Sequence, residues 1–149
     1  MVKALSIGLL CSICFFSCTE RSKQKIKLGH SYRNIDLEYA DLSGLDLSDI
    51  DFSGANLQKA NLSRSNLTRT CLIGSNLSYA NLKGANLHYA NLRDANLYRA
   101  DISGANLTHT TLIDVNFTNT FVKEALFSST EGLSLKTKKR LRIHGAFID

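Results

Sequence analysis

The chain has 149 residues, which is enough for one domain, and it contains no Pro and no Trp. Its formal net charge of +5 is uneven, because the basic excess lies in residues 21–33 and 136–142 while the part between them is slightly acidic. The sequence has no Gly-rich phosphate loop, no paired catalytic carboxylates and no nucleophile elbow, so we expect neither an enzyme nor a bound cofactor.

Residues 1–17 have the pattern of an export signal. Lys3 gives a positive start, and residues 4–17 form an almost wholly apolar run that is too short for a membrane span of about 20 residues. Cys18 follows a small residue, which looks like a bacterial lipoprotein signal in which Cys18 is lipidated. Two bulky phenylalanines before it depart from that pattern, so a cleaved signal, a retained anchor and no targeting role remain alternatives. We expect an exported protein of the bacterial cell envelope, lipid-anchored at its N-terminus.

Residues 18–34 are predicted to form a polar tether and then the N-terminal edge of the domain. Ile26 and Leu28 alternate with Lys25 and Lys27, as in a short strand. Such a strand would cover the open end of the structure that follows.

Residues 35–127 carry an uninterrupted repeat of five residues. A large apolar residue recurs at every fifth position, a mostly small residue lies two positions before it, and Asn or Asp usually lies between them. The repeat reads Ala-Asn-Leu-x-x. Its large apolar residues are Leu37, Leu42, Leu47, Phe52, Leu57, Leu62, Leu67, Leu72, Leu77, Leu82, Leu87, Leu92, Leu97, Ile102, Leu107, Leu112, Phe117, Val122 and Phe127.

A period of five fits neither a helix nor a flat strand. Five residues advance an α-helix by about 500°, so the leucines would form no stripe, and an odd step along a strand places successive side chains on opposite faces. The backbone must therefore turn once per repeat, so that each Leu points to one axis. The result is a solenoid in which each repeat buries its Leu against its neighbours.

These repeats resemble the pentapeptide-repeat family, whose motif is A-(D/N)-L-x-x. The resemblance implies an all-β solenoid, a right-handed quadrilateral parallel β-helix with about 20 residues per coil, and its hand agrees with the general rule for parallel crossovers. Residues twenty apart would then stack in ladders about 4.8 Å apart. We expect Phe52, Phe117 and Phe127, near the ends of the repeats, to plug the open ends of a narrow core.

Glycines inside the repeats share one phase, two residues after the central Leu. A type II turn needs a positive φ at such a position, which Gly adopts readily. We therefore expect a different turn in repeats with another residue there, among them those of Lys59, Arg64, Arg69, Tyr79 and Arg99. The outward Asn and Asp side chains are interpreted as hydrogen-bond partners of the turns.

Residues 128–149 lose the phase of the repeat and are predicted to form a C-terminal cap, which the resemblance also implies. Ser134 is a candidate N-cap for a short basic helix that runs to residue 143, with Gly145 as its stop. Residues 145–149 are expected to return as a last strand. Four apolar side chains of this segment are expected to turn inward: Leu133, Leu135, Leu141 and Ile143.

One candidate binding surface combines aromatic and basic residues. With twenty residues to a coil, an outer ladder and its edge contain Tyr39, Lys59, Tyr79, Tyr98 and Arg99. Such a face suits a protein or a glycan. The alternative is that these long side chains stack merely to cover the sheet.

The basic segment near the C-terminus is a second candidate. It contains Lys136, Lys138, Lys139, Arg140 and Arg142. These cations could meet phosphate, and lipid head groups suit an exported protein better than nucleic acid does. The alternative is a solvated helix face whose cations favour the helix C-terminus.

Two further groups of residues give weaker indications of a functional site. His88 and His109 would lie one coil apart on one outer face beside Tyr89, but a metal site lacks a third ligand there, so we predict no metal. Cys71 is the one cysteine inside the repeats, and we expect it to point outward without a catalytic role.

Together these features predict a non-catalytic scaffold for protein interaction or structural support, whose partner is a protein or an envelope surface. The alternative is a DNA mimic that protects a topoisomerase, a function implied by resemblance to some family members. The positive net charge, the leader and the concentration of acidic residues in the first coil depart from that class.

Overall fold

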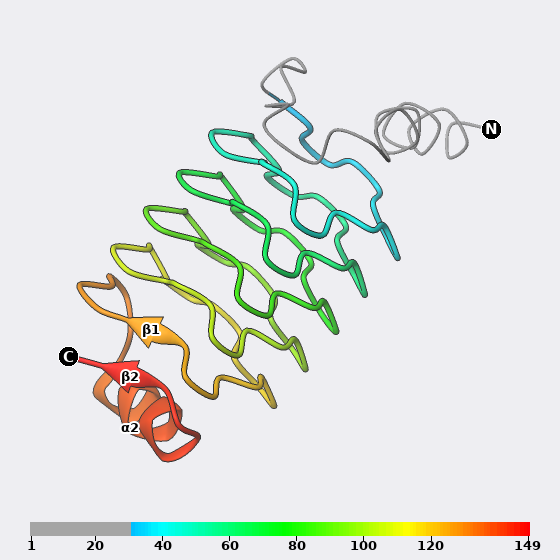
Figure 1. Cartoon of the computed structure of the whole chain (residues 1–149). Coiled ribbons are helices and arrows are strands. Elements are labelled where there is room, and N and C mark those ends of the chain that lie inside the picture. Colours follow the sequence, from blue (N-terminus) through cyan, green and yellow to red (C-terminus); the bar gives the residue numbers. More distant parts are fainter. Residues whose placement is uncertain (1–30) are drawn as a thin grey trace.

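The computed structural model describes residues 31–149, whose backbone winds into a stack of coils (Figure 1). The predictions for the leader, Cys18, the tether and the strand at residues 25–28 lie outside the described residues. The coils are joined by parallel bridges between residues twenty apart, from Ser31 and Asp51 to Thr111 and Glu131. This register gives four repeats per coil, as the resemblance implies.

Each repeat makes one short flat segment and one corner. The N–H of Leu57 donates to the carbonyl of Asn76 in the next coil at 2.8 Å. The N–H of Lys59 donates to the carbonyl of Ser78 at 2.9 Å, and the N–H of Ala60 closes the turn on the carbonyl of Leu57 at 3.1 Å. The backbone groups of one coil are thus satisfied by the adjacent coils and by the turns.

The corners correct the prediction about turns. Gly44 has a φ of 66° at its corner, and Lys59 has a φ of 57° at the equivalent place. The backbone N–H of each donates to the next coil at 2.9 Å, so a corner of another shape would break the contact between coils. A left-handed residue costs only about 1–2 kcal/mol, which the coil stacking outweighs. The repeats for which a different turn was wrongly predicted all have positive φ: those of Lys59, Arg64, Arg69, Tyr79 and Arg99.

The leucine column fills the axis of the solenoid. Leu57, Leu77 and Leu97, one coil apart, are all 0% exposed. The small positions two residues earlier are buried as well, because they lie inside the corner. Where Ser replaces Ala, as at Ser65, the hydroxyl donates to the carbonyl of Leu62 at 2.7 Å, so the polar group is accommodated.

Aromatic rings lie at both ends of this core, as predicted. The ring of Phe52 is buried and its centroid lies 5.8 Å from that of Tyr32. At the other end, the rings of Phe117 and Phe127 are buried with their centroids 6.1 Å apart. A ring fills more of the terminal coil than a leucine would, and it thereby replaces contacts that the next coil would otherwise supply.

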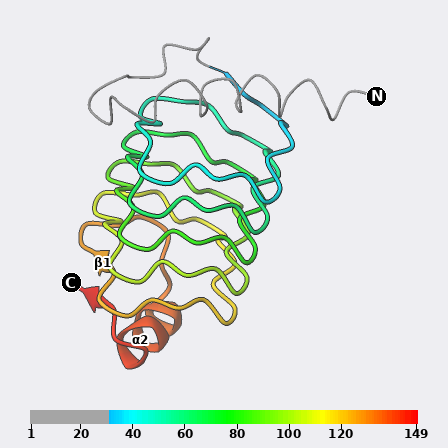
Figure 2. The same ribbon diagram turned by 45° about the vertical axis from the view of Figure 1, so that its right-hand side comes forward.

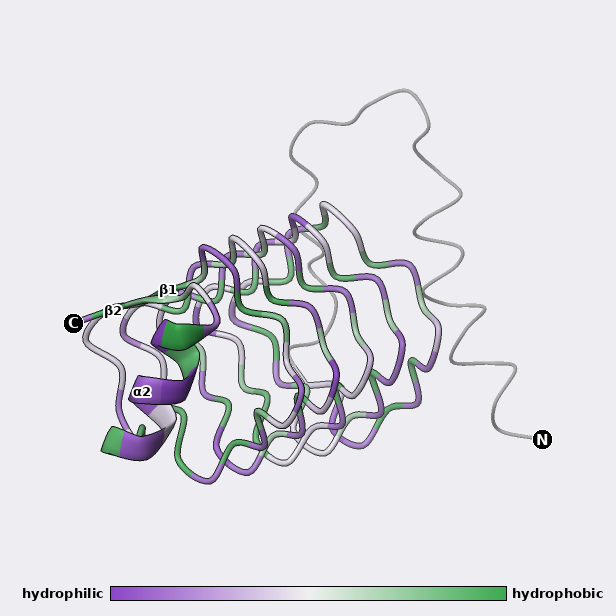
Figure 3. Ribbon diagram, turned by 90° about the horizontal axis from the view of Figure 1, so that it is seen from below, coloured by the Kyte–Doolittle hydropathy of each residue, from purple (hydrophilic) through white to green (hydrophobic). Residues whose placement is uncertain are grey.

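Three regular elements end the chain: β1 (Leu126–Phe127), α2 (Leu135–Ile143) and β2 (Phe147–Ile148). The helix lies beyond the last coil, close to the C-terminus (Figures 2 and 3). The predicted last strand is present as β2, which pairs in parallel with β1. Ser134 is the N-cap of α2, as predicted, and its Oγ accepts a hydrogen bond from the N–H of Thr137 at 3.1 Å.

The apolar residues around α2 divide between core and surface. Leu141 is buried in the core and Leu133 is partly buried against it. Leu135 and Ile143 are 87% and 72% exposed, so the prediction that they turn inward was wrong. One straight helix presents a single stripe to its support, and in α2 that stripe contains Leu141.

The outward Asn and Asp side chains form hydrogen-bonded columns. Oδ1 of Asn61 accepts the N–H of Ser63 at 3.2 Å, which is the turn contact that the sequence predicts. Nδ2 of Asn61 donates to Oδ1 of Asp41 in the preceding coil at 3.0 Å, and Asn81 donates to Asn61 at 3.1 Å. Two other columns, which begin at Asp36 and Asp46, run the same way, with the later coil donating to the earlier one.

This direction explains three of the acidic residues in the first coil. The first member of a column accepts from the next coil, and an ionised carboxylate is an acceptor only. Asp36, Asp41 and Asp46 occupy this place, and each receives an Asn amide from the following coil. Hydrogen bonds from Ser43 also hold the pKa of the Asp41 carboxyl below its ordinary value.

Candidate functional site

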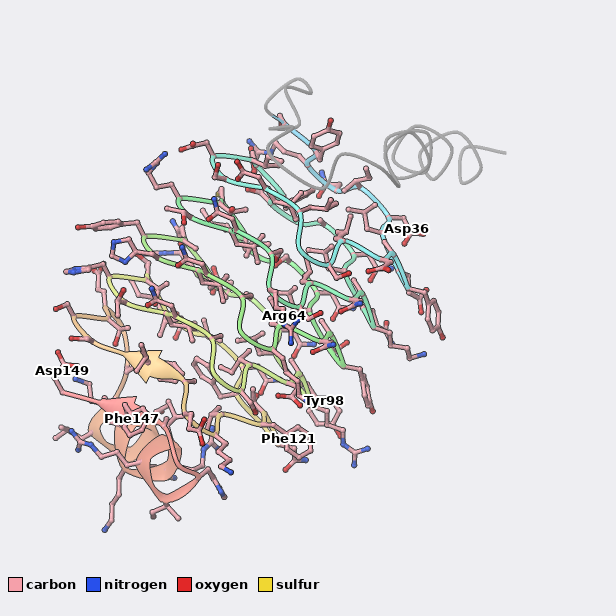
Figure 4. The ribbon with its side chains drawn as sticks, in the orientation of Figure 1. Asp36, Arg64, Tyr98, Phe121, Phe147 and Asp149 are labelled. Atoms are coloured by element: carbon pink, nitrogen blue, oxygen red, sulfur yellow. The ribbon has the colours of Figure 1, made fainter. Side chains whose placement is uncertain are left out.

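The best-defined surface is a row of side chains along one corner of the solenoid, which we call the corner ridge. It consists of Tyr39, Lys59, Tyr79 and Arg99, with Tyr98 beside them. The first four occupy the left-handed position of the same corner in successive coils, with φ between 55° and 61°. Tyr39 and Tyr79 are 66% and 43% exposed. Figure 4 shows Tyr98 next to side chains that project from this corner.

Contacts between rings and cations order the ridge. Nζ of Lys59 donates to the hydroxyl of Tyr39 at 2.5 Å and lies 4.6 Å from the centre of its ring, and this hydrogen bond raises the pKa of Lys59. Cζ of Arg99 lies 5.8 Å from the ring centre of Tyr79 and 5.4 Å from that of Tyr98. The two tyrosine rings meet edge to face with their centroids 5.6 Å apart. The structure therefore brings all five predicted residues together.

The spacing of the ridge determines what it can bind. Adjacent coils lie about 4.8 Å apart, so the backbone positions of Lys59 and Arg99 are separated by about 10 Å, with that of Tyr79 between them. Carboxylates of a partner could reach the cations while an apolar group packs on the ring. Because the side chains stand on a rigid backbone and already contact one another, little conformational entropy would be lost on binding.

The diagonally opposite corner, two corners further along the coil, carries His88, Tyr89 and His109. The ring of Tyr89 stacks on His109 with centroids 4.9 Å apart, and the His88 and His109 centroids are 5.4 Å apart. Nδ1 of His88 lies 2.6 Å from Oγ1 of Thr108. Within residues 31–149, no group of three or more His, Cys, Asp or Glu side chains is arranged to hold a metal ion. The corner thus forms a packed ring cluster, in which the two histidines are close, as predicted.

The five basic residues of the C-terminal segment fall into two sets. Nζ of Lys138 donates to the carbonyl of Asp149 at 3.4 Å, and Arg142 donates to the carbonyl of Ile148 at 3.2 Å. These two cations help to hold the last strand. The exposed remainder consists of Lys136, Lys139 and Arg140.

Cys71 lies at an Asn position and is half-buried, as most of the outward Asn side chains are, so it points outward as predicted. Its Sγ lies 3.1 Å from Oγ of Ser53 in the preceding coil. The thiol therefore takes a place in a column of polar side chains.

In the part of the chain that the structure describes, no helix has the length and apolar character needed to cross a membrane.

The sequence interpretation missed the apolar side chains that are exposed near the C-terminus. Phe121 is 61% exposed at an Asn position, one coil after Asp101, where a polar column ends (Figure 4). Leu135 and Ile143 are exposed on α2. The two residues are eight positions apart, slightly more than two helical turns, so they lie on one face of the helix. This spacing is the sequence signal that could have revealed the surface.

Comparison with known proteins agrees with the repeat. The family model for pentapeptide repeats matches residues 33–69, 65–104, 75–113 and 90–128, with 8 copies. These matches join into an unbroken stretch over well more than half of the chain. Among curated proteins, no sequence matches the chain.

Several solved structures are similar to this chain. A pentapeptide repeat protein from Nostoc Pcc 7120 is 24% identical over 80% of this chain and 85% of its own, with a TM-score of 0.38. One from the Arabidopsis thaliana thylakoid lumen is 27% identical over 78% and 80%, with a TM-score of 0.45. A trypsin-treated form of QnrB1, a plasmid-mediated fluoroquinolone resistance protein, is 17% identical over 86% of each chain, with a TM-score of 0.39.

Proposed function

Because the chain belongs to the pentapeptide-repeat family, we propose that it is a non-catalytic scaffold that binds another protein through the corner ridge. The observation that carries this proposal is the alternation of rings and cations on consecutive coils, with Lys59 on Tyr39 and Arg99 against Tyr79 and Tyr98. The partner would present acidic side chains on both sides of an apolar group. A repeat whose axis is filled by leucine is a rigid support for such a surface.

We further propose that this scaffold works at the bacterial cell envelope, exported by its leader and anchored through lipidated Cys18. The support is the sequence of residues 1–18, with its positive start, apolar run and terminal cysteine. Labelling cells with radioactive palmitate, for the natural chain and Cys18→Ala, tests the anchor. The natural chain should be labelled and the variant should not, and absence of label from both would remove the lipid anchor.

The corner ridge is tested by photo-crosslinking in cells. A photoreactive phenylalanine analogue at Tyr79 should give one discrete crosslinked product, which disappears when Lys59 and Arg99 are both changed to Glu. The matched control places the same analogue at Tyr89, an exposed tyrosine at another corner. Equal products from both positions, or a product that tolerates the charge reversal, would contradict binding at the ridge.

The DNA-mimic alternative is not favoured. A DNA mimic presents negative charge along its length, whereas the carboxylates of Asp36, Asp41 and Asp46 begin the polar columns of the first coil and accept hydrogen bonds there. Along the later coils these columns consist largely of neutral amides, and the chain as a whole carries a net charge of +5. A gyrase supercoiling assay with the purified protein should therefore show no effect, and protection of the enzyme would revive this alternative.

A further inference from the structure

We propose that the helix at the C-terminal end of the solenoid docks on an anionic lipid bilayer. The surface concerned, which we call the outer face of α2, consists of Leu135, Lys136, Lys139, Arg140 and Ile143. This inference goes beyond binding at the corner ridge and does not depend on lipidation of Cys18.

The outer face is defined by helical geometry and burial. Leu135, Lys139 and Ile143 follow at intervals of four residues, which places them along one side of a helix. Leu141, on the opposite side, is buried in the core. Leu135 and Ile143 are 87% and 72% exposed. In Figure 3 hydrophobic segments appear at both ends of α2 with hydrophilic ones between them.

Charge distinguishes this face from an ordinary exposed helix. Residues 135–143 contain five cations and no acidic residue. Lys138 and Arg142 donate to carbonyls of the last strand, which leaves Lys136, Lys139 and Arg140 to meet a partner. The carboxylate of nearby Asp149 accepts hydrogen bonds from the hydroxyl of Ser128 and the N–H of Ser129, and within residues 31–149 no ion pair joins it to these three cations.

The combination of exposed aliphatic residues and cations fits an anionic membrane surface. Aliphatic side chains enter the boundary between head groups and acyl chains, while Lys and Arg are attracted to acidic head groups. Nucleic acid would use the cations but gives Leu135 and Ile143 nothing apolar to enter. A second copy of the chain would bring two sets of cations against each other, which opposes self-association through this face.

The expected strength of membrane binding follows from the number of cationic and aliphatic side chains on this face. Each Lys or Arg near an anionic bilayer strengthens binding by about fivefold, so the three free cations together contribute about 100-fold. The two aliphatic side chains together add about tenfold or more if they enter the interface. Salt should weaken the first contribution, since exposed charges are screened over about 8–10 Å at physiological ionic strength.

The test is flotation of the full chain with phosphatidylcholine vesicles, with and without phosphatidylglycerol. One variant carries Lys136→Gln, Lys139→Gln and Arg140→Gln, and a second carries Leu135→Ser and Ile143→Ser. The matched control carries Arg64→Gln, Lys83→Gln and Arg93→Gln, which remove the same net charge from the coils. All variants retain the leader, so differences among them report on α2, and far-UV circular dichroism and melting temperature check that each is folded.

We expect binding to anionic vesicles to fall about 100-fold in the first variant and about tenfold in the second. The control should remain close to the natural chain. Equal losses in the control and the first variant would mean that net charge alone drives binding, which overturns the proposal. Unchanged vesicle binding in the second variant would also overturn it. So would a chain that binds duplex DNA and not vesicles, and that loses this DNA binding when the three cations are replaced.

Discussion

The direction of the Asn columns leads to a sharp prediction for Asn66→Asp. Nδ2 of Asn66 donates to Oδ1 of Asp46 at 2.9 Å. The substitution removes this donor and places two carboxylates about 3 Å apart at neutral pH. Losing a hydrogen bond to a charged group costs about 1.5–3 kcal/mol, and repulsion between two half-exposed charges at this distance adds about 1 kcal/mol even in water-like surroundings. We expect a loss of about 2.5–4 kcal/mol in the free energy of unfolding at pH 7.

The assay is urea unfolding followed by far-UV circular dichroism, with Asn119→Asp as the matched control. Asn119 is exposed at a corner with a φ of 57°, so its change adds the same charge without replacing a column donor. Asp is tolerated in that left-handed conformation, and we expect the control to change stability by less than about 0.5 kcal/mol.

The pH dependence of the variant provides an independent check. Two carboxylates that share a site raise the folded-state pKa of one of them above its unfolded value near 3.9. The folded state then binds the proton more tightly, so the penalty is complete above the raised pKa and is relieved as the pH falls toward about 4. The difference in stability between variant and natural chain should narrow over that range. A difference that is independent of pH, or a loss no larger than that of Asn119→Asp, would refute the column mechanism.

Three other predictions concern packing, corners and capping. Leu77→Ala, at a fully buried position of the leucine column, should lower the free energy of unfolding by about 2.7–5 kcal/mol in urea, and a loss under 1 kcal/mol would contradict a filled axis. Arg64→Gly should raise the melting temperature, because Arg64 has a φ of 57° that Gly adopts without strain. Gly104→Ala, at a φ of 66°, should lower the melting temperature by the equivalent of about 1 kcal/mol. A change of melting temperature in the same direction for both would contradict a shared left-handed corner. Ser134→Ala removes the hydrogen bond from the N–H of Thr137 and should weaken α2 by about 1 kcal/mol, visible as roughly fivefold faster amide exchange in that helix alone.

The period of the sequence was sufficient to predict the architecture. A large apolar residue at every fifth position requires one turn per repeat and therefore places Leu57 and Leu77 in the core, where both are 0% exposed. The outer residues of one column were also predictable, since Tyr79 and Arg99 differ by twenty positions. Their contacts were not, because ring and cation geometry depends on side-chain rotamers that the period does not constrain.

The corners show where local preference misleads. Considered alone, Lys59 is a poor residue for positive φ, and a different turn was the reasonable prediction. In the structure, its corner has the same shape as that of Gly44, because both must deliver an N–H to the next coil. The preference of one residue amounts to about 1–2 kcal/mol, which is small beside the register of a whole stack.

The sequence by itself thus determined the repeat, the buried column and the residues available at each corner, because these follow from spacing along the chain. The tertiary structure alone decided the direction of the Asn columns, the shape shared by all corners and the outward position of Leu135 and Ile143. These features depend on which groups meet across coils or against the end of the stack. Such contacts depend on the relative placement of distant segments, which the five-residue spacing does not determine.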